Sequence, residues 1–100
     1  MHELVLTPEA FDDIRSARQW YDEQSEGVGS EFNAAVGTLL KTICRNPQAF
    51  PEVGPAIRRA VLRRFPYKVF YTFDEQQVFV AVVLHNARDP AIALKRLRSH

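Results

Sequence analysis

Apolar residues recur at helical spacing along two stretches of the N-terminal half. The first stretch begins after Thr7, which is suited to cap a helix, and Pro8, which fits the first helical position. Two glycines in SEGVGS (25–30) interrupt the pattern, and a second apolar stripe runs from Phe32 to the stop at Asn46–Pro47. The two stretches predict an antiparallel helical hairpin.

Alternation of period two predicts the strands. Residues 3–6 are expected to form a short strand, and three more are expected at Ile57–Leu62, Tyr67–Phe73 and Val78–His85. The last of these is apolar on both faces, so we expect it to be central and covered on both sides. Short links between the three make an antiparallel meander.

The remaining segments complete the predicted topology. Residues 46–55 hold three prolines and a glycine and are expected to be a loop, while Asp89 and Pro90 suit the start of a short C-terminal helix. The predicted order is β-α-α-β-β-β followed by that helix. The fold class is α+β, with the helical hairpin packed on an antiparallel sheet.

Composition limits the classes of protein to which the chain can belong. Its 100 residues are enough for one domain, and 46% apolar with 25% charged residues is typical of a soluble globular protein. The single cysteine, Cys44, provides neither a disulfide framework nor a cysteine-based zinc site, so we expect a reducing cytoplasm. No stretch resembles a signal peptide or a membrane span.

The net charge of +1 conceals an asymmetry between the two halves of the chain. Residues 1–56 hold four Lys or Arg against nine Asp or Glu, a net charge of −5, whereas residues 57–100 hold nine against three, a net charge of +6. The asymmetry indicates either a polarised surface with an anionic partner or two halves that neutralise each other across the fold.

Most of the cations lie in RRAVLRRFPYKVFY (58–71). The two pairs Arg58–Arg59 and Arg63–Arg64 are candidates for phosphate or partner contacts, or for a solvated edge strand. Because neighbouring residues on a strand point to opposite faces, each pair is expected to be divided between two surfaces.

Two other residues carry candidate chemistry or binding. His85 ends a strand beside Arg88, where it is either a general acid or base or a polar residue that closes the strand. Trp20 lies at the flank of its helical stripe, where it either joins the core or lines a groove for a partner. The sequence contains no phosphate-binding glycine loop, no paired-histidine metal motif and no serine elbow, so we expect neither a cofactor nor a metal ion.

In this order, several segments resemble the toxins of the RelE/ParE superfamily of type II toxin–antitoxin modules. They are ARQWYDEQ, GVGSEF, NPQAFPEV, IRRAVLRRFPYKVFY and LHNARDP. The resemblance covers nearly the whole chain, 1–100, as a single toxin domain. It is closest to the ParE-like branch, whose members are often called plasmid stabilisation proteins.

The resemblance implies a bacterial or plasmid protein that arrests growth unless a cognate antitoxin wraps it. Two activities occur in the superfamily: RelE-like members cut mRNA on the ribosome, and ParE-like members poison DNA gyrase. RelE-like enzymes have arginine where this chain has Lys68, and they have a tyrosine near the C-terminus that is missing here. His85 and Arg88 are the only nearby substitutes, so the cleavage residues look incomplete.

We therefore expect a toxin, more consistent with a non-enzymatic one, that inhibits DNA gyrase or a related topoisomerase and is neutralised by a ParD-like or similar antitoxin. The alternatives are a ribosome-dependent mRNA endonuclease using Lys68, His85 and Arg88, and a member that binds an antitoxin without toxicity. Direct binding of nucleic acid stays open. The expected partner contacts are Arg58, Arg59, Arg63, Arg64 and Trp20, and the residues expected to contribute to toxicity are Lys95, Arg96 and Arg98.

Overall fold

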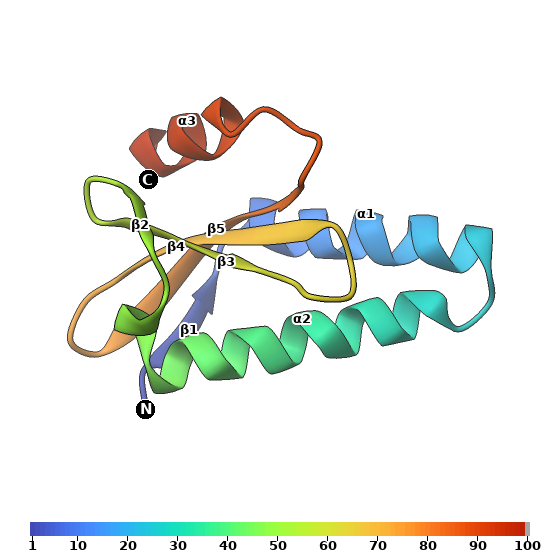
Figure 1. Ribbon diagram of the computed structural model, residues 1–100, viewed down its shortest axis with the longest axis horizontal. Coiled ribbons are helices and arrows are strands. Elements are labelled where there is room, and N and C mark those ends of the chain that lie inside the picture. The colour runs from blue at the N-terminus through green and yellow to red at the C-terminus, as the bar shows by residue number, and fades with distance from the viewer. Residues whose placement is uncertain (100) are drawn as a thin grey trace.

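The computed structural model describes residues 1–99 and confirms the predicted α+β fold (Figure 1). The helix predicted at the C-terminus is present, and residue 100 lies outside the described chain. The elements, in order, are β1 (Glu3–Leu6), α1 (Pro8–Gln24), α2 (Val28–Arg45), the 3-10 helix η1 (Pro47–Ala49), β2 (Glu52–Gly54), β3 (Ile57–Val61), β4 (Tyr67–Phe73), β5 (Gln77–His85) and α3 (Ala91–Ser99).

The five strands form one mixed sheet in the order β1-β5-β4-β3-β2. The meander β3-β4-β5 is antiparallel, as predicted. The prediction of a wholly antiparallel sheet is wrong in one respect, because β1 pairs with β5 in parallel. The α1–α2 hairpin returns the chain to the end of the sheet at which β1 begins. The direction of β5, which is set by the meander that follows, then determines that β5 runs parallel to β1. The short strand β2, inside the predicted loop, was also not anticipated.

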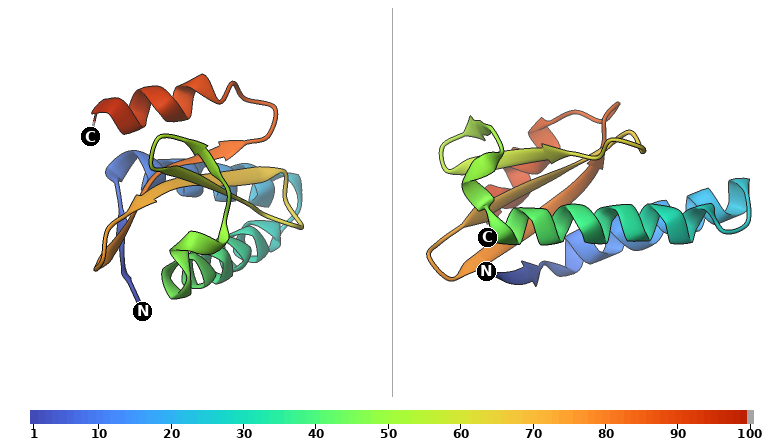
Figure 2. Two further views of the ribbon diagram at one scale, coloured as in Figure 1. Left: turned by 60° about the vertical axis from the view of Figure 1, so that its left-hand side comes forward. Right: turned by 60° about the horizontal axis from the view of Figure 1, so that its bottom comes forward.

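The two faces of the sheet are covered by different helices (Figures 1 and 2). The hairpin face, on which Val69 and Val80 lie, packs against α1 and α2. The α3 face, on which Phe70, Val82 and Leu84 lie, packs against α3. Strand β5 is therefore central and apolar on both sides, as predicted.

One irregularity interrupts the pairing of β4 with β5. Phe70 pairs with Val82 and Tyr71 pairs with Val80, which leaves Ala81 as an extra residue in β5. Such a bulge changes which face each later residue of its strand occupies.

The helical hairpin depends on a close approach between its helices at Gly29. The Gly29 amide donates a hydrogen bond of 2.8 Å to the Asp22 carboxylate. A methyl group on Gly29 would overlap the Arg18 carbonyl and the Asp22 side chain, whereas the same group on Gly37 would meet nothing within 4 Å. Gly29, the second glycine of GVGSEF, is therefore required by packing.

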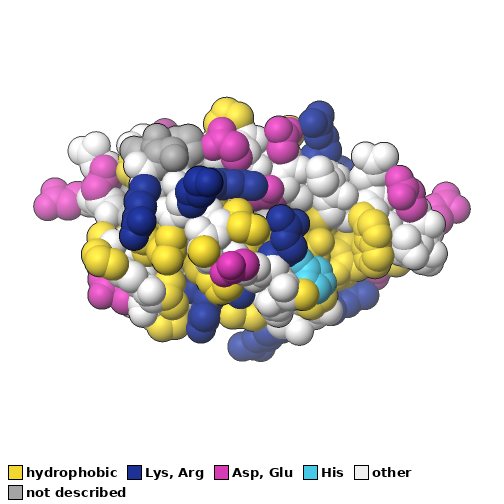
Figure 3. Space-filling view, turned by 90° about the horizontal axis from the view of Figure 1, so that it is seen from above, with side chains coloured by type: hydrophobic (Ala, Val, Ile, Leu, Met, Phe, Trp, Pro, Cys, Tyr) yellow, Lys and Arg dark blue, Asp and Glu magenta, His cyan; other side chains and the backbone are white. Residues whose placement is uncertain are grey.

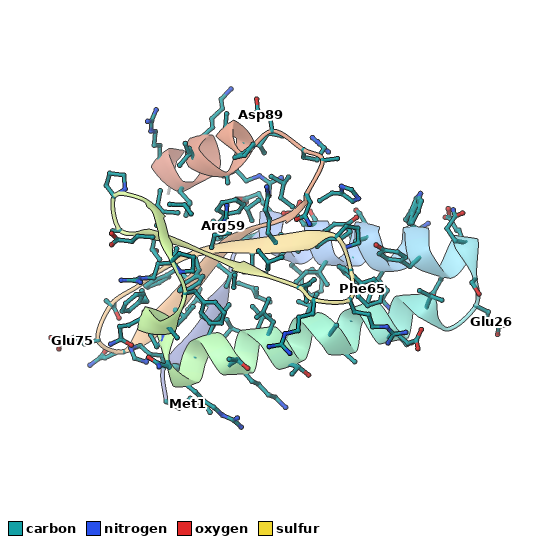
Figure 4. All side chains as sticks on the ribbon, in the orientation of Figure 1. Met1, Glu26, Arg59, Phe65, Glu75 and Asp89 are labelled. Atoms are coloured by element: carbon teal, nitrogen blue, oxygen red, sulfur yellow. The ribbon has the colours of Figure 1, made fainter. Side chains whose placement is uncertain are left out.

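An aromatic cluster joins the hairpin to the β3–β4 turn. The ring of Phe32 lies 5.3 Å from Phe65 and 5.0 Å from Tyr67, and Tyr21 lies 5.0 Å from Phe65, all between ring centroids. Figure 4 shows Phe65 at the tip of this turn, facing α2. These edge-to-face contacts hold the turn against the hairpin.

We predict opposite effects for the same substitution at the two glycines. Gly29→Ala lowers the free energy of unfolding by about 2–3 kcal/mol, because the new methyl group forces the helices apart. Gly37→Ala serves as the matched control and raises it by about 1 kcal/mol, because it replaces a helical glycine in open space. Urea denaturation of both variants measures the effects, and equal effects would contradict the packing role of Gly29.

We also predict a loss of stability at alkaline pH that depends on Tyr71. Burial raises the pKa of the Tyr71 hydroxyl from 10.0 to about 12, with Arg58 opposing the shift, and the hydroxyl donates a hydrogen bond of 2.7 Å to the Pro47 carbonyl. The unfolded chain therefore loses this proton first. The contribution of the Tyr71 hydroxyl to the free energy of unfolding is complete below pH 10 and falls by about 3 kcal/mol as the pH rises to 12.

Denaturation curves across this pH range test the contribution of Tyr71. Tyr71→Phe lowers stability at neutral pH by about 1 kcal/mol through the lost hydrogen bond and makes the alkaline decline shallower. Tyr21 and Tyr67 are present in both proteins, so the difference between the two curves reports Tyr71. Parallel curves would contradict the prediction.

Candidate partner-binding site

A groove of about 420 Å³ opens where β5 extends beyond β1. Strand β1 ends at Leu6, opposite Val80, whereas β5 continues to His85. Among the described residues, no strand neighbours the last residues of β5 on that side, and α1 and α3 form the walls. The groove is lined by Asp12, Asp13, Ser16, Ala17, Trp20, Tyr67, Val83, Leu84, His85, Arg88, Ile92 and Arg96.

Asp13 closes the open edge of β5 at the base of this groove. Its Oδ2 atom accepts a hydrogen bond of 3.0 Å from the Val83 amide and one of 2.6 Å from Arg96 Nη1. Arg96 Nη2 donates to Asp13 Oδ1 at 3.2 Å, so the ion pair is bidentate. The Asp13 hydrogen bond raises the pKa of Arg96, with burial opposing it.

Arg96 is one of the three residues expected from the sequence to contribute to toxicity, but its side chain is partly buried and held by this ion pair. Its side chain is 30% exposed and that of Asp13 is 18% exposed. Arg96 Nη1 also lies 3.5 Å from the Ala81 carbonyl. Lys95 and Arg98, the other two residues of that set, are exposed on α3.

Trp20 projects from α1 into the groove. It is 53% exposed and lies edge-on to Tyr21, with ring centroids 5.1 Å apart. Tyr67 and His85 line the same groove, also edge-on at 5.1 Å. The groove therefore offers an accessible tryptophan beside two partly covered rings and the cation of Arg88.

His85 uses one ring nitrogen and its carbonyl to shape the turn after β5. Its Nδ1 atom accepts a hydrogen bond of 2.9 Å from the Ala87 amide, and its carbonyl accepts one of 2.9 Å from the Arg88 amide. In the neutral ring the proton is then on Nε2, because Nδ1 is an acceptor. In this state Nε2 is a donor and cannot take a proton.

The three candidate catalytic residues are divided by the sheet. His85 pairs with Tyr67, while Lys68 pairs with Leu84. Cross-strand partners share a face, so His85 lies on the hairpin face and Lys68 on the α3 face. Lys68 Nζ lies 5.8 Å from the centroid of the Phe70 ring. The structure brings His85 and Arg88 together in the groove and leaves Lys68 outside it.

The pair Arg58–Arg59 is divided between the two faces of β3, as strand alternation predicts, whereas Arg63 and Arg64 lie in the bend after β3. Arg58 donates to the carbonyls of Gln48 at 3.1 Å and Phe50 at 2.7 Å. Arg64 pairs with Glu31 of α2 at 3.0 Å. Arg59 lies opposite Phe70 on the α3 face, and Arg63 is exposed after β3.

Part of the charge asymmetry is neutralised across the fold. Arg58–Glu52, Arg64–Glu31 and Arg96–Asp13 each join the basic half to the acidic half. Within the described residues, the cations of the basic half that lack an ion pair include Arg59, Arg63, Lys68, Arg88 and Arg98.

Asp13 was not among the functional or structural residues predicted from the sequence. The residue lies three positions after Ala10 and four before Ala17, both buried in the core stripe of α1. A carboxylate at a core-facing helical position is the signal that was available, because such a group needs a partner. Periodicity alone does not identify that partner.

Other kinds of site have little support in the described residues. No group of three or more His, Cys, Asp or Glu side chains within 1–99 is arranged to hold a metal ion. None of the helices in that range has the length and apolar character needed to cross a membrane.

Comparisons with known proteins identify the family. The sequence profile of the ParE toxin of the type II toxin–antitoxin system parDE matches residues 4–90, which is most of the chain. The chain belongs to the ParE toxin family. No curated protein matches the sequence at a significant level.

A solved structure agrees with the fold of this family. A chain of the chromosomal ParDE toxin–antitoxin system from P. aeruginosa is similar with a TM-score of 0.63 and 16% identity. The match covers 85% of this chain and 96% of that one. At this identity the likeness concerns the fold, while the family match identifies the chain as a type II toxin.

We predict that Asp13→Asn lowers the free energy of unfolding by about 2 kcal/mol, because it removes the charge that pairs with the partly buried Arg96. Asp12→Asn is the matched control on the neighbouring residue. Its ion pair with Arg15 is solvent-exposed, so the expected change is below about 0.5 kcal/mol. Urea denaturation compares the two, and similar small losses would contradict the role given to Asp13.

Proposed function

We propose that this type II toxin acts by binding and inhibiting DNA gyrase or a related topoisomerase, and that a cognate antitoxin neutralises it in the cytoplasm. The ParE family match supports an action of this kind, and the solved relative belongs to a ParDE toxin–antitoxin system. The toxin would act as a binding protein.

The observation that carries this proposal is the separation of the candidate catalytic groups. Metal-free RNA cleavage needs a base, an acid and cationic donors around one phosphate. Lys68 and His85 lie on opposite faces of the sheet, and the neutral form of His85 is a donor at Nε2. This arrangement favours binding over ribonuclease chemistry.

The groove beside α1 is the proposed contact for the target. Trp, Tyr and Arg dominate the energetic centres of protein interfaces, and Trp20, Tyr67 and Arg88 line this groove together. Lys95 and Arg98 on α3 would extend the contact, and Arg96 would support it by holding α3 in place through Asp13.

We predict that the purified toxin traps DNA breaks in a gyrase supercoiling and cleavage reaction and leaves mRNA intact in a translating extract. Trp20→Ala should weaken the gyrase effect by at least about 10-fold, because it removes the exposed anchor of the groove. Phe11→Ala is the control, since Phe11 is 57% exposed on the same helix but does not line the groove.

Three results would overturn parts of this proposal. Cleavage of mRNA at the ribosomal A site would identify a ribonuclease. Inactivity in both reactions would indicate an antitoxin-binding member without toxicity. Equal effects of Trp20→Ala and Phe11→Ala would exclude the groove as the target contact.

A further inference from the structure

Strand β1 forms one edge of the sheet, and the outer side of its backbone has no strand partner among the described residues. Figure 2 shows β1 at the border of the molecule, next to the first turn of α1. The amides of Glu3 and Thr7 donate to carbonyls of β5 and of the turn before it, at 2.8 and 3.1 Å. Because strand backbone groups alternate in direction, the amides and carbonyls of Leu4 and Leu6 point outward.

The two edge strands of the sheet differ in their protection against pairing. Proteins commonly protect an exposed edge with proline, with charge or with an irregular strand. Pro51 and Pro55 flank β2 at the opposite edge, and the register of β2 with β3 shifts between Glu52 and Gly54. Strand β1 pairs regularly with β5, contains no proline and reads ELVL, with Leu4 39% exposed. The edge at β1 therefore keeps the features of a strand that can accept a partner.

We propose that β1 pairs antiparallel with β1 of a second copy of this chain, which joins the two sheets into one. A twofold axis at Val5 places Leu4 of each copy opposite Leu6 of the other. Every outward amide and carbonyl of these two residues then has a partner in the other copy. The contact is isologous, so it closes as a dimer. Self-association of this kind is independent of the proposed target.

The side chains of β1 suit a second β1 in this register. Leu6 packs against the core on the hairpin face, and Leu4 shares that face because strand side chains alternate. Opposite residues of an antiparallel pair share a face, so the leucines of the two copies form one aliphatic cluster. The two Val5 side chains meet on the α3 face. Glu3, the charged residue of β1, lies opposite Thr7 and not opposite a second carboxylate.

The charges at the two ends of β1 are also complementary to those of a second copy. The C-terminal end of α2 lies beside the start of β1, because the amide of residue 2 donates to a carbonyl in the last turn of α2 at 2.9 Å. Lys41 and Arg45 are exposed at this end and have no ion pair among the described residues. The end of β1 leads into α1, whose first turns carry Glu9 and Asp12. Antiparallel pairing places the basic end of each copy beside the acidic end of the other, which favours a second copy as the occupant.

The pairing leaves the other candidate surfaces open. Trp20 lies about 18 Å along α1 from Pro8, at a distance from the paired strands. The twofold axis of an edge-to-edge pair runs perpendicular to the sheet, so both copies present α3 in the same direction. Figure 3 views the molecule from the α3 side, where cations lie among hydrophobic side chains. A dimer would therefore present two copies of this side and two grooves.

We expect a weak dimer, because four strand residues from each copy make a contact smaller than a standard interface. The expected dissociation constant is on the order of 10 μM. Sedimentation velocity of the full toxin, at concentrations well below and well above this value, measures the association. A toxin that stays monomeric throughout would overturn the inference.

Leu4→Lys should weaken the dimer by at least about 10-fold, because it places two ammonium groups at diagonal positions on one face. Val53→Lys is the matched control, since Val53 is 38% exposed on the opposite edge strand and its substitution should leave the association unchanged. Circular dichroism verifies that each variant is folded. Equal weakening by the two substitutions would count against pairing at β1.

A mixture of two variants tests self-pairing directly. Leu4→Lys mixed with Leu4→Glu should form a heterodimer that is more stable than the dimer of either variant alone, since opposite charges then occupy the diagonal positions. Failure of the mixture to associate more strongly than each variant alone would contradict the twofold register.

Amide hydrogen exchange on the unmodified toxin provides a further measurement. The amides of Leu4 and Leu6 should exchange more slowly as the toxin concentration rises, since each then donates to the second copy. The Val5 amide points toward β5 and should be protected at every concentration. Exchange at Leu4 and Leu6 that does not depend on concentration would overturn the pairing. Protection of these amides by the purified antitoxin, and not by the toxin itself, would assign the edge to the antitoxin instead.

Discussion

The carboxylate of Asp13 supplies the hydrogen-bond acceptor that β5 lacks where it extends beyond β1. The edge of β5 beyond β1 leaves the Val83 amide without a strand partner, and Asp13 accepts its hydrogen bond. The same carboxylate pairs with Arg96, so a single side chain of α1 joins the sheet edge to α3. Both the groove beside α1 and the position of the C-terminal helix depend on this contact.

The sheet divides the polar chemistry of the molecule between its two sides. His85 and Tyr67 lie on the hairpin face, beside Trp20, whereas Arg59 and Lys68 lie on the α3 face. The two sides of the sheet therefore differ in character. One offers accessible aromatic rings, and the other offers cations beside an unpaired strand edge.

The sequence predicted what depends on local periodicity and could not predict what depends on distant neighbours. The helices, the β3–β4–β5 meander and the division of Arg58 from Arg59 followed from side-chain spacing. The parallel pairing of β1 did not, because its neighbour is more than 70 positions away in the chain. The partners of Asp13 lie 70 and 83 positions away, and no local pattern records them. The antitoxin and target contacts stay predictions.

The extra residue at Ala81 determines more than a local bend in β5. All later residues of the strand occupy the face opposite to the one that regular pairing would give them. If β5 kept all its residues and paired regularly beyond Val80, His85 would lie opposite Pro66, on the same face as Lys68 and Arg59. The bulge thus separates an imidazole from two cations that a one-residue shift of pairing register would place on one surface.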